Sequence, residues 1–247
     1  MSESLFDAPQ APLTAAAPKP PSLMEQIEGI FTAPKALFQR LNQAPSWVPA
    51  LILAMVLGLV VAILWGLKVD ADAMLRPVLE ANPKLGPDQI DNIIQMQSKF
   101  MLPFGILGVL FGIPIVTLIA GLINWGLGRG MTEAGAQPPT FLHGLAAASV
   151  PGLVRLPDTL LVIAMCALKT VGGHKPDQVA PDSLGYFIHT ASPKLQALLY
   201  ALNPFTIASL VMAYLAMRYT VKAKPAGAAL SVGIWVVLIL IGVAFAK

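Results

Sequence analysis

Five long stretches of this chain hold few or no charged residues, and this feature constrains the fold more than any other. The stretches cover residues 47–67, 100–128, 140–170, 204–221 and 225–246. About 20 consecutive apolar residues cross the hydrocarbon core of a bilayer as one helix. Only 12% of the chain is charged and 56% is hydrophobic, whereas ordinary globular domains carry roughly 25% charged residues. The sequence therefore predicts an all-α polytopic membrane protein, a bundle of five transmembrane helices over residues 47–246.

Two different segments precede the first span. Residues 1–21 are rich in Ala and Pro, have little to bury, and are predicted to be a disordered, solvated tail. Residues 22–41 begin with Ser22 and Glu25 at the spacing of a capping box, which predicts a helix start. An apolar stripe with cationic flanks follows, and it includes Leu23, Ile27, Phe31 and Phe38. We expect an amphipathic helix at the membrane interface, with packing against the protein's own spans as the alternative.

The second span is predicted to begin as a water-exposed helix. Gly86, Pro87 and Asp88 have the order typical of a helix start, because Pro fits the first helical position and an acid suits the first turn. This helix should run into residues 100–128, where prolines would bend it. The span also contains two GxxxG pairs, Gly108 with Gly112 and Gly126 with Gly130. Such pairs let another helix approach closely, within this chain or in a dimer, and we favour the first.

The orientation follows from the positively charged residues. Five spans place the two termini on opposite sides of the membrane. With a cytoplasmic N-terminus, seven Lys and Arg residues lie inside and eight lie outside, which does not decide the orientation. The bias toward inside charges is strongest in short connectors, and these fall on the N-terminal side. We therefore predict a multi-pass protein of the cell inner (cytoplasmic) membrane with its N-terminus in the cytoplasm.

Patterns typical of catalysis, metal binding or nucleic-acid binding are absent from the sequence. The three histidines, His143, His174 and His189, lack the spacing of a zinc site. There is no nucleophile elbow, phosphate loop or dinucleotide loop, and the net charge of +3 forms no basic cluster. We expect no enzyme activity, no cofactor and no bound nucleic acid. The expected partner is the lipid bilayer, and a homo-oligomer or contacts with other membrane proteins stay open.

The third stretch contains the sharpest polar feature, Arg155 and Asp158, near the middle of a predicted span. An unpaired charge at that depth costs about 3 kcal/mol on translocon scales. Pro151 and Pro157 flank the arginine and predict two half-helices, with Leu156 pushed from helical geometry and Asp158 in the first turn of the second half. A structural ion pair is the simpler interpretation. The alternative is an intramembrane polar site of the kind that broken helices form in transporters, with His143 as a further candidate.

Several motifs resemble those of the Yip domain family, the Ypt/Rab-interacting membrane proteins, and in particular its bacterial branch. The similarity covers roughly residues 27–246. It rests on Ile30-Phe31-Thr32-Ala33-Pro34 with Phe38, Leu41, Trp47 and Pro49, on Thr140-Phe141 with Leu145 and Pro151, and on Leu202-Asn203-Pro204-Phe205.

The resemblance implies a five-span helical bundle with a cytoplasmic N-terminus. It also implies a role in membrane organisation or in scaffolding partner proteins. Eukaryotic members bind Rab-type GTPases, but their Asp-Leu-x-Gly-Pro signature is replaced here by the segment FTAPKALF. GTPase binding and catalytic residues are therefore not carried over. The principal function hypothesis is a non-enzymatic Yip-type membrane protein, and the alternative is a small transporter or channel subunit that uses Arg155 and Asp158.

Overall fold

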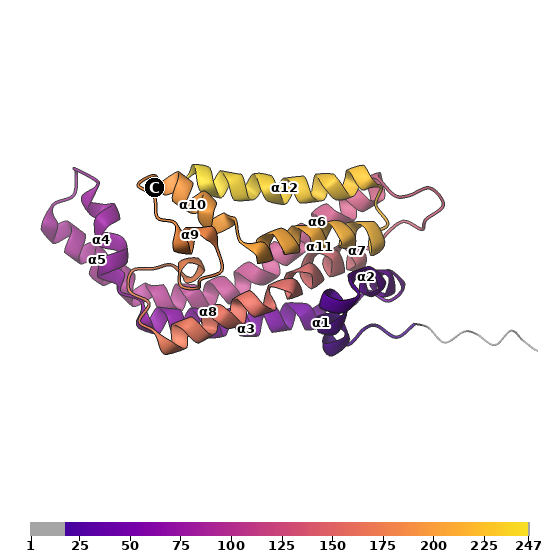
Figure 1. Ribbon diagram of the computed structural model, residues 1–247, viewed down its shortest axis with the longest axis horizontal. Helices are drawn as coiled ribbons and strands as arrows, with labels where there is room; N and C mark the ends of the chain where they lie inside the picture. The colour runs from indigo at the N-terminus through magenta and orange to yellow at the C-terminus, as the bar shows by residue number, and fades with distance from the viewer. Residues whose placement is uncertain (1–17, 247) are drawn as a thin grey trace, which may run out of the picture.

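The computed structural model describes residues 18–246, and within that range every element is a helix and none is a β-strand. The all-α prediction is confirmed. The helices run side by side along one long axis, with α1 (Leu23–Thr32) and α2 (Pro34–Gln43) at one end and α4 (Ala71–Glu80) at the other (Figure 1). Most of the predicted N-terminal tail, residues 1–17, lies outside the described part of the chain. Pro21, at its predicted boundary, is buried.

Four helical stretches among the described residues are long and apolar enough to cross a membrane, and a bent pair makes a fifth candidate. The four are α3 (Val48–Lys68), the stretch Pro87–Gly130, the stretch Phe141–Leu168 and α12 (Pro225–Ala244). The bent pair is α10 (Pro193–Ala201) and α11 (Pro204–Tyr219), and the helix direction changes by 58° between them. The predicted fourth span therefore contains only a 16-residue helix, and it passes the length test only together with α10.

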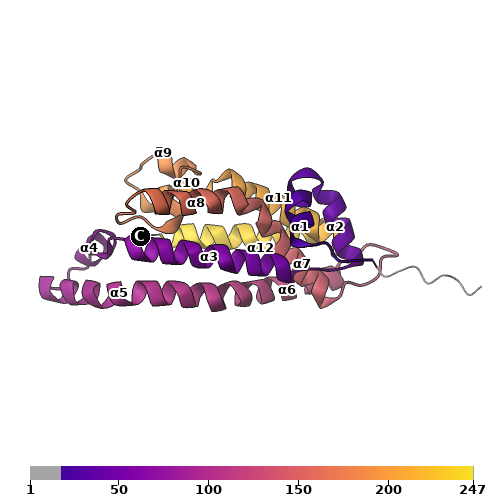
Figure 2. The same cartoon turned by 90° about the horizontal axis from the view of Figure 1, so that it is seen from below.

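The stretch Pro87–Gly130 is one long helix in three parts: α5 (Pro87–Leu107), the π-helical turn η1 (Gly108–Gly112) and α6 (Ile113–Gly130). It starts where the Gly-Pro-Asp pattern predicts. It lies along α3 and extends beyond it, and α4 packs on the protruding part (Figure 2). The π-helical turn lies between the two prolines of the span, Pro103 and Pro114, where the sequence predicts bending.

The prediction that the GxxxG pairs pack against another helix of the same chain is wrong. A Cβ atom built on any of their four glycines meets no atom within 4 Å. Close approach occurs instead where α6 crosses α7 (Phe141–Ser149). A Cβ atom on Gly144 would lie 2.3 Å from the carbonyl oxygen of Gly121, so only glycine fits there. The motif spacing is common by chance, and burial rather than spacing identifies the glycines that matter.

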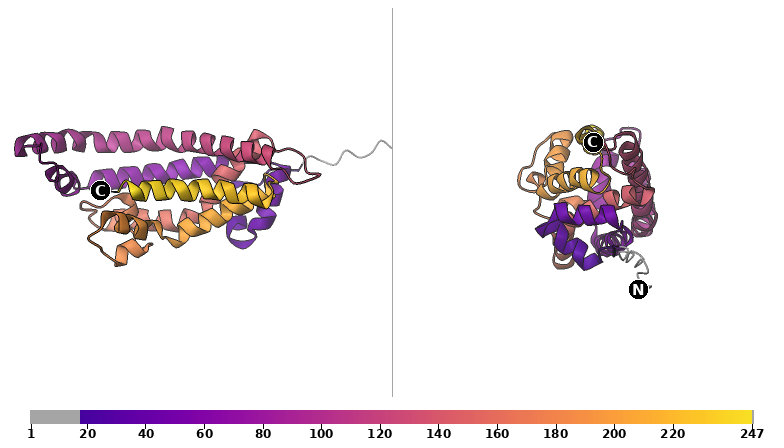
Figure 3. Two further views of the ribbon diagram at one scale, coloured as in Figure 1. Left: turned by 90° about the horizontal axis from the view of Figure 1, so that it is seen from above. Right: turned by 90° about the vertical axis from the view of Figure 1, so that its right-hand side faces the viewer.

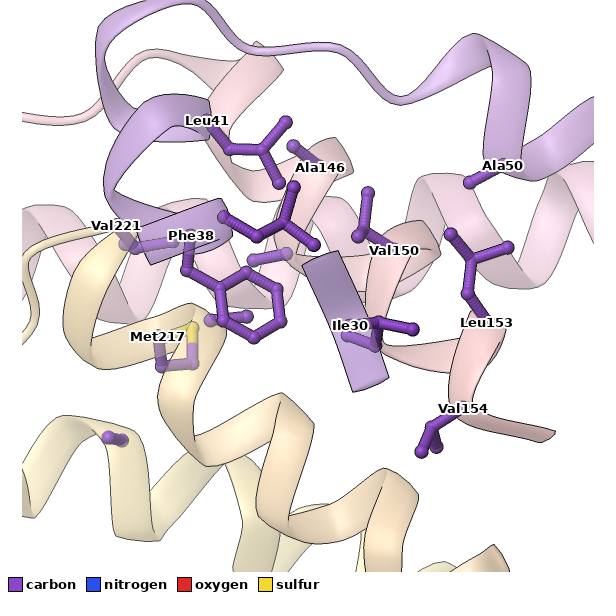
Figure 4. Close-up of a cluster of buried hydrophobic side chains, with 14 of the residues drawn as sticks. Ile30, Phe38, Leu41, Ala50, Ala146, Val150, Leu153, Val154, Met217 and Val221 are labelled. Carbon is purple, nitrogen blue, oxygen red and sulfur yellow. The ribbon is translucent and has the colours of Figure 1, made fainter. Parts of the chain in front are cut away.

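The main hydrophobic core lies at the α1/α2 end of the bundle (Figure 4). The predicted amphipathic segment is two helices, separated at Ala33 because Pro34 starts a new helix. Phe38 and Ile30 are fully buried against the spans, as the packing alternative predicts, whereas Phe31 is 49% exposed. The buried cluster consists of Ile30, Leu37, Phe38, Leu41, Ala50, Ala146, Ala147, Val150, Leu153, Val154, Ala216, Met217, Val221, Ala223 and Ala228.

Hydrogen bonds fasten α2 to the end of α11. The Asn42 side chain donates to the Thr220 carbonyl at 2.7 Å, and the Thr220 hydroxyl donates to the Phe38 carbonyl at 3.0 Å. The chain then turns at Lys222, whose φ of 59° is left-handed, and enters α12. The carbonyls at these helix ends therefore find partners, although a bilayer core would offer them none. Seen from the end, the two N-terminal helices lie across one end of the bundle (Figure 3).

Candidate functional site

The third span is a broken helix made of α7, the 3-10 segment η2 (Val150–Arg155) and α8 (Leu156–Leu168). Pro151 and Pro157 lack an N–H donor, so the regular α-helical ladder cannot continue through them. The expected distortion at Leu156 is wrong, because that residue is helical with φ −52° and ψ −47°. The departure falls one residue earlier, at Arg155, whose ψ is 4°. Leu156 and Pro157 instead form the first turn of α8, where a missing donor costs nothing.

This break brings Arg155 and Asp158 into contact. Arg155 donates to Asp158 Oδ2 from Nη2 at 2.9 Å and from Nε at 3.2 Å. The Asp158 side chain is 5% exposed and the Arg155 side chain is 48% exposed. Asp158 also lies in the first turn of α8, where the positive end of the helix dipole favours an anion. The arginine head reaches outward, and the carboxylate faces the interior.

The connector that follows α8 folds back over this pair. It contains the short elements η3 (Pro176–Gln178) and α9 (Leu184–Phe187) and leads into α10. Its half-buried Asp182 carboxyl lies against Asp158. Asn203, at the start of α11, donates from Nδ2 to Asp182 Oδ2 and accepts from the Phe205 N–H at 2.7 Å. Asn203 therefore caps α11 and holds the connector at the same time.

An open cavity of about 460 Å³ lies beside these side chains, between the connector and α3. Its polar lining includes Arg155, Asp158, Asp182 and Asn203, together with the hydroxyl-bearing residues Thr159, Tyr200 and Thr206. Burial, followed by the hydrogen bond and negative charge of Asp158, raises the pKa of Asp182 to about 7. Asp182 belongs to the connector, outside the helical spans. The arrangement can hold a cationic group or a proton, because two acids face one arginine.

His143 does not belong to this cavity. It precedes Arg155 by 12 residues, which is about 18 Å along a helix. Its Nδ1 lies 3.0 Å from the Thr140 backbone nitrogen and 2.7 Å from Thr140 Oγ1, so the His143 side chain caps α7. Its Nε2 lies 2.8 Å from the Asn42 carbonyl oxygen. This candidate from the sequence therefore joins α7 to α2 at the opposite end of the bundle.

Sequence reasoning missed Asp182 and the contact that Asn203 makes with it. They lie 24 and 45 residues after Asp158, beyond the reach of any helical spacing. The pattern Asn203-Pro204 does predict a helix cap, but a cap alone names no distant partner. Among the side chains that the structure describes, no three from His, Cys, Asp or Glu gather as a set of metal ligands.

Comparison with known proteins adds one match. The model of the Yip1 domain family matches residues 29–246, which is most of the chain. No curated protein and no solved structure matches it. The match starts within α1 and extends through α12, so it includes the end of α1, the whole of α2 and the broken third span.

Proposed function

The chain belongs to the Yip1 domain family, a family of generally non-catalytic polytopic membrane proteins, and from this premise we propose a specific role. It is an inner-membrane protein of the family's bacterial branch, and it organises the bilayer or partner proteins through α1 and α2. The rest of the chain, residues 47–246, is the membrane domain that carries these helices. The N-terminus and the α1/α2 end face the cytoplasm.

The apolar sector of α1 is wider than the part that the bundle covers, and this observation carries the proposal. Gln26 and Ile30 are buried, and Ile27 beside them is half-buried. Met24 and Phe31 continue the same sector, yet they are 72% and 49% exposed. They are seven residues apart, so they share one face of the helix. An apolar stripe at the edge of a docked helix suits contact with the headgroup and acyl boundary.

The charge at this end supports the same role. Seven Lys and Arg residues and three Glu residues belong to the α1/α2 end among the described residues. The basic residues are Lys19, Lys35, Arg40, Arg129, Arg218, Lys222 and Lys224. Basic residues near the cytoplasmic leaflet are attracted to anionic lipids by about 1 kcal/mol each. The same residues favour a cytoplasmic orientation, since they lie close to the ends of spans.

Site-directed fluorescence tests the proposal. The full chain is placed in nanodiscs that contain anionic lipid, and a fluorophore is attached to cysteine at position 24, 31 or 32. The single natural cysteine, Cys166, is buried. We expect lipid-borne quenchers to reach the labels in Met24→Cys and Phe31→Cys. The matched label in Thr32→Cys, an exposed residue at the centre of the polar side of the same helix, should be quenched from water. Equal quenching from water at all three positions would refute an interfacial α1.

A second candidate function follows from the cavity beside the third span. Its lining by Arg155 and Asp158 favours a small transporter or channel subunit, because broken helices in transporters place such groups at substrate sites. Arg155→Ala and Asp158→Ala should then abolish flux in proteoliposomes while the protein stays folded. The exchange Arg155→Asp with Asp158→Arg is the control. If the exchange restores a phenotype that each single variant loses, the two residues are a structural pair.

A further inference from the structure

Two buried carboxylate oxygens at the cavity beside α8 have no hydrogen-bond partner among the described residues, Asp158 Oδ1 and Asp182 Oδ1. The second oxygen of each acid is satisfied: Arg155 donates to Asp158 Oδ2, and Asn203 donates to Asp182 Oδ2. Buried polar atoms are nearly always paired, so an unpaired atom needs an explanation. Here two acceptors from neighbouring acids are left without a donor, although the two side chains are in contact.

The charges around these acids do not balance without a further positive charge. Asp158 on α8 and Asp182 on the connector face one cation, Arg155. The walls from α3, α5 and η1 add no titratable group. Those residues are Gly58, Val61, Ala62, Trp65, Gly105 and Val109. The α10 wall adds Tyr200, which is not without a partner, and Lys175 of the connector lines an adjoining cavity with Arg155. Among the described side chains that line this cavity, Asp158, Asp182 and Arg155 therefore leave one negative charge at the acid pair.

A proton satisfies both the charge and the geometry. Two carboxylates in contact at a poorly solvated site do not both ionise, and one of them retains its proton. A proton on one acid supplies the missing donor for the other. A metal ion would need more ligands than this cluster holds, and no three metal-ligating side chains gather among those that the structure describes.

We propose that Asp158 and Asp182 form a proton-binding site in which a proton on Asp182 Oδ1 is donated to Asp158 Oδ1. The bound proton fastens the connector between α8 and α10, residues 169–192, to α8. On deprotonation the O–H bond of Asp182 breaks, its electron pair stays on the carboxylate, and the proton leaves to water through the open cavity. Two carboxylates then face each other and repel, so the connector separates from α8. This site is independent of the proposed role of α1 and α2, and it shares Asp158 and the cavity with the transporter alternative.

The direction of the pH effect follows from the same contact. The pKa of Asp182 is raised to about 7, first by burial and then by Asp158. An acid whose pKa is raised in the folded state makes folding less favourable as pH rises from its ordinary range to the raised value. The connector should therefore be held most firmly below pH 7 and loosen above it. The sequence contains 13 Asp and Glu residues, so the test must isolate this one.

Infrared spectroscopy and hydrogen exchange test the site on the full chain in nanodiscs. At pH 6 we expect the C=O stretching band of a protonated carboxylic acid, which disappears as pH rises through about 7. Amides of the connector should exchange faster over the same range. Asp182→Asn removes the titrating acid and should lose both the band and the pH dependence of exchange. Asp158→Asn leaves the burial of Asp182 in place but removes the neighbouring acid, so both transitions should move to lower pH.

Asp88→Asn is the matched control, because Asp88 is an exposed acid on α5 far from the cavity. It should leave the band and the exchange unchanged. The proposal is overturned if both changes persist in Asp182→Asn, or if Asp158→Asn leaves both transitions at their original pH. It is equally overturned if a tenfold change in sodium concentration at fixed pH changes the C=O band and the exchange rate. The ligand is then a metal cation. A negative result for the proton site would leave the expected fluorescence result at α1 unaffected, because α1 lies at the other end of the bundle.

Discussion

The two ends of this bundle are built in opposite ways. At the α1/α2 end, aliphatic side chains from α1, α2, α7, η2 and α11 form one continuous core around Phe38 (Figure 4). At the other end, the connector after α8 covers an open cavity lined by acids. The buried apolar cluster between this connector and α8 consists of Cys166, Val171 and Val179. The first end resembles the interior of a soluble protein. The second depends on a few polar contacts.

This difference separates stability from adaptability. A large apolar core excludes alternative arrangements because every displaced side chain loses many contacts. A polar joint between Asp158, Asp182 and Asn203 can be changed by one proton or one substitution. We therefore expect the α1/α2 end to determine whether the chain folds, and the connector end to determine which arrangement the folded chain adopts.

The largest effect is expected at Phe38. Phe38→Ala removes a fully buried ring from the core and should lower the free energy of unfolding by about 3 to 5 kcal/mol. Phe31→Ala is the control on the neighbouring helix, and because Phe31 is half exposed it should change stability by less than about 0.5 kcal/mol. Reversible unfolding in mixed detergent micelles measures both. Similar losses for the two variants would mean that the core does not lie where Figure 4 places it.

The next effect concerns the crossing of α6 and α7. Gly144→Ala places a methyl group against the Gly121 carbonyl and the Trp125 side chain, so the helices must separate. Overpacking of this kind costs about 1 to 3 kcal/mol. Gly126→Ala, on the open side of α6, should be neutral or slightly stabilising because alanine favours a helix. The same unfolding measurement distinguishes them, and a tolerated Gly144→Ala would contradict the close approach.

A smaller loss is expected at the connector end. Arg155→Ala leaves the buried Asp158 without its cation, but the arginine is half exposed and water can replace part of its contact. We expect a loss of about 1 to 2 kcal/mol, below that of Phe38→Ala. Arg155→Lys should recover part of it, since lysine restores the charge but not the paired donors. A loss equal to that of Phe38→Ala would mean that both ends hold the fold together.

The sequence predicts the features that depend on neighbouring residues and misses those that depend on contacts between distant segments. Apolar runs, prolines and caps act over a few residues, so the spans, the break near Pro151 and the start at Pro87 follow from local patterns. The packing face of α1 also has a helical period, but the period does not say how much of the stripe the bundle covers. The Asp158–Asp182 contact joins residues from two segments through a folded connector, and nothing near either residue indicates it. The glycines at the α6–α7 crossing likewise depend on tertiary packing.

The smallest predicted effect tests the polar edge of α1. The Ser22 backbone N–H donates to Glu25 at 2.7 Å, and Arg40 on α2 donates to the same carboxylate at 3.0 Å. These contacts lower the pKa of Glu25 to about 2, with the Ser22 backbone as the larger cause. A lowered carboxyl pKa stabilises the fold above the ordinary Glu range, and this contribution is lost as pH falls through about 2.

Arg40→Gln removes the charged partner from α2 but leaves the Ser22 cap. The pKa of Glu25 should rise only part of the way toward its ordinary value, and a carbon-13 titration of the Glu25 carboxyl by NMR measures this. Ser22→Ala is the matched change on the other side, although it removes only the hydroxyl acceptor of the cap. If Arg40→Gln restores an ordinary pKa, the ion pair between the helices governs Glu25. A partial rise instead shows that the start of α1 is set by its own cap, so α1 can begin as a helix before it docks on the core.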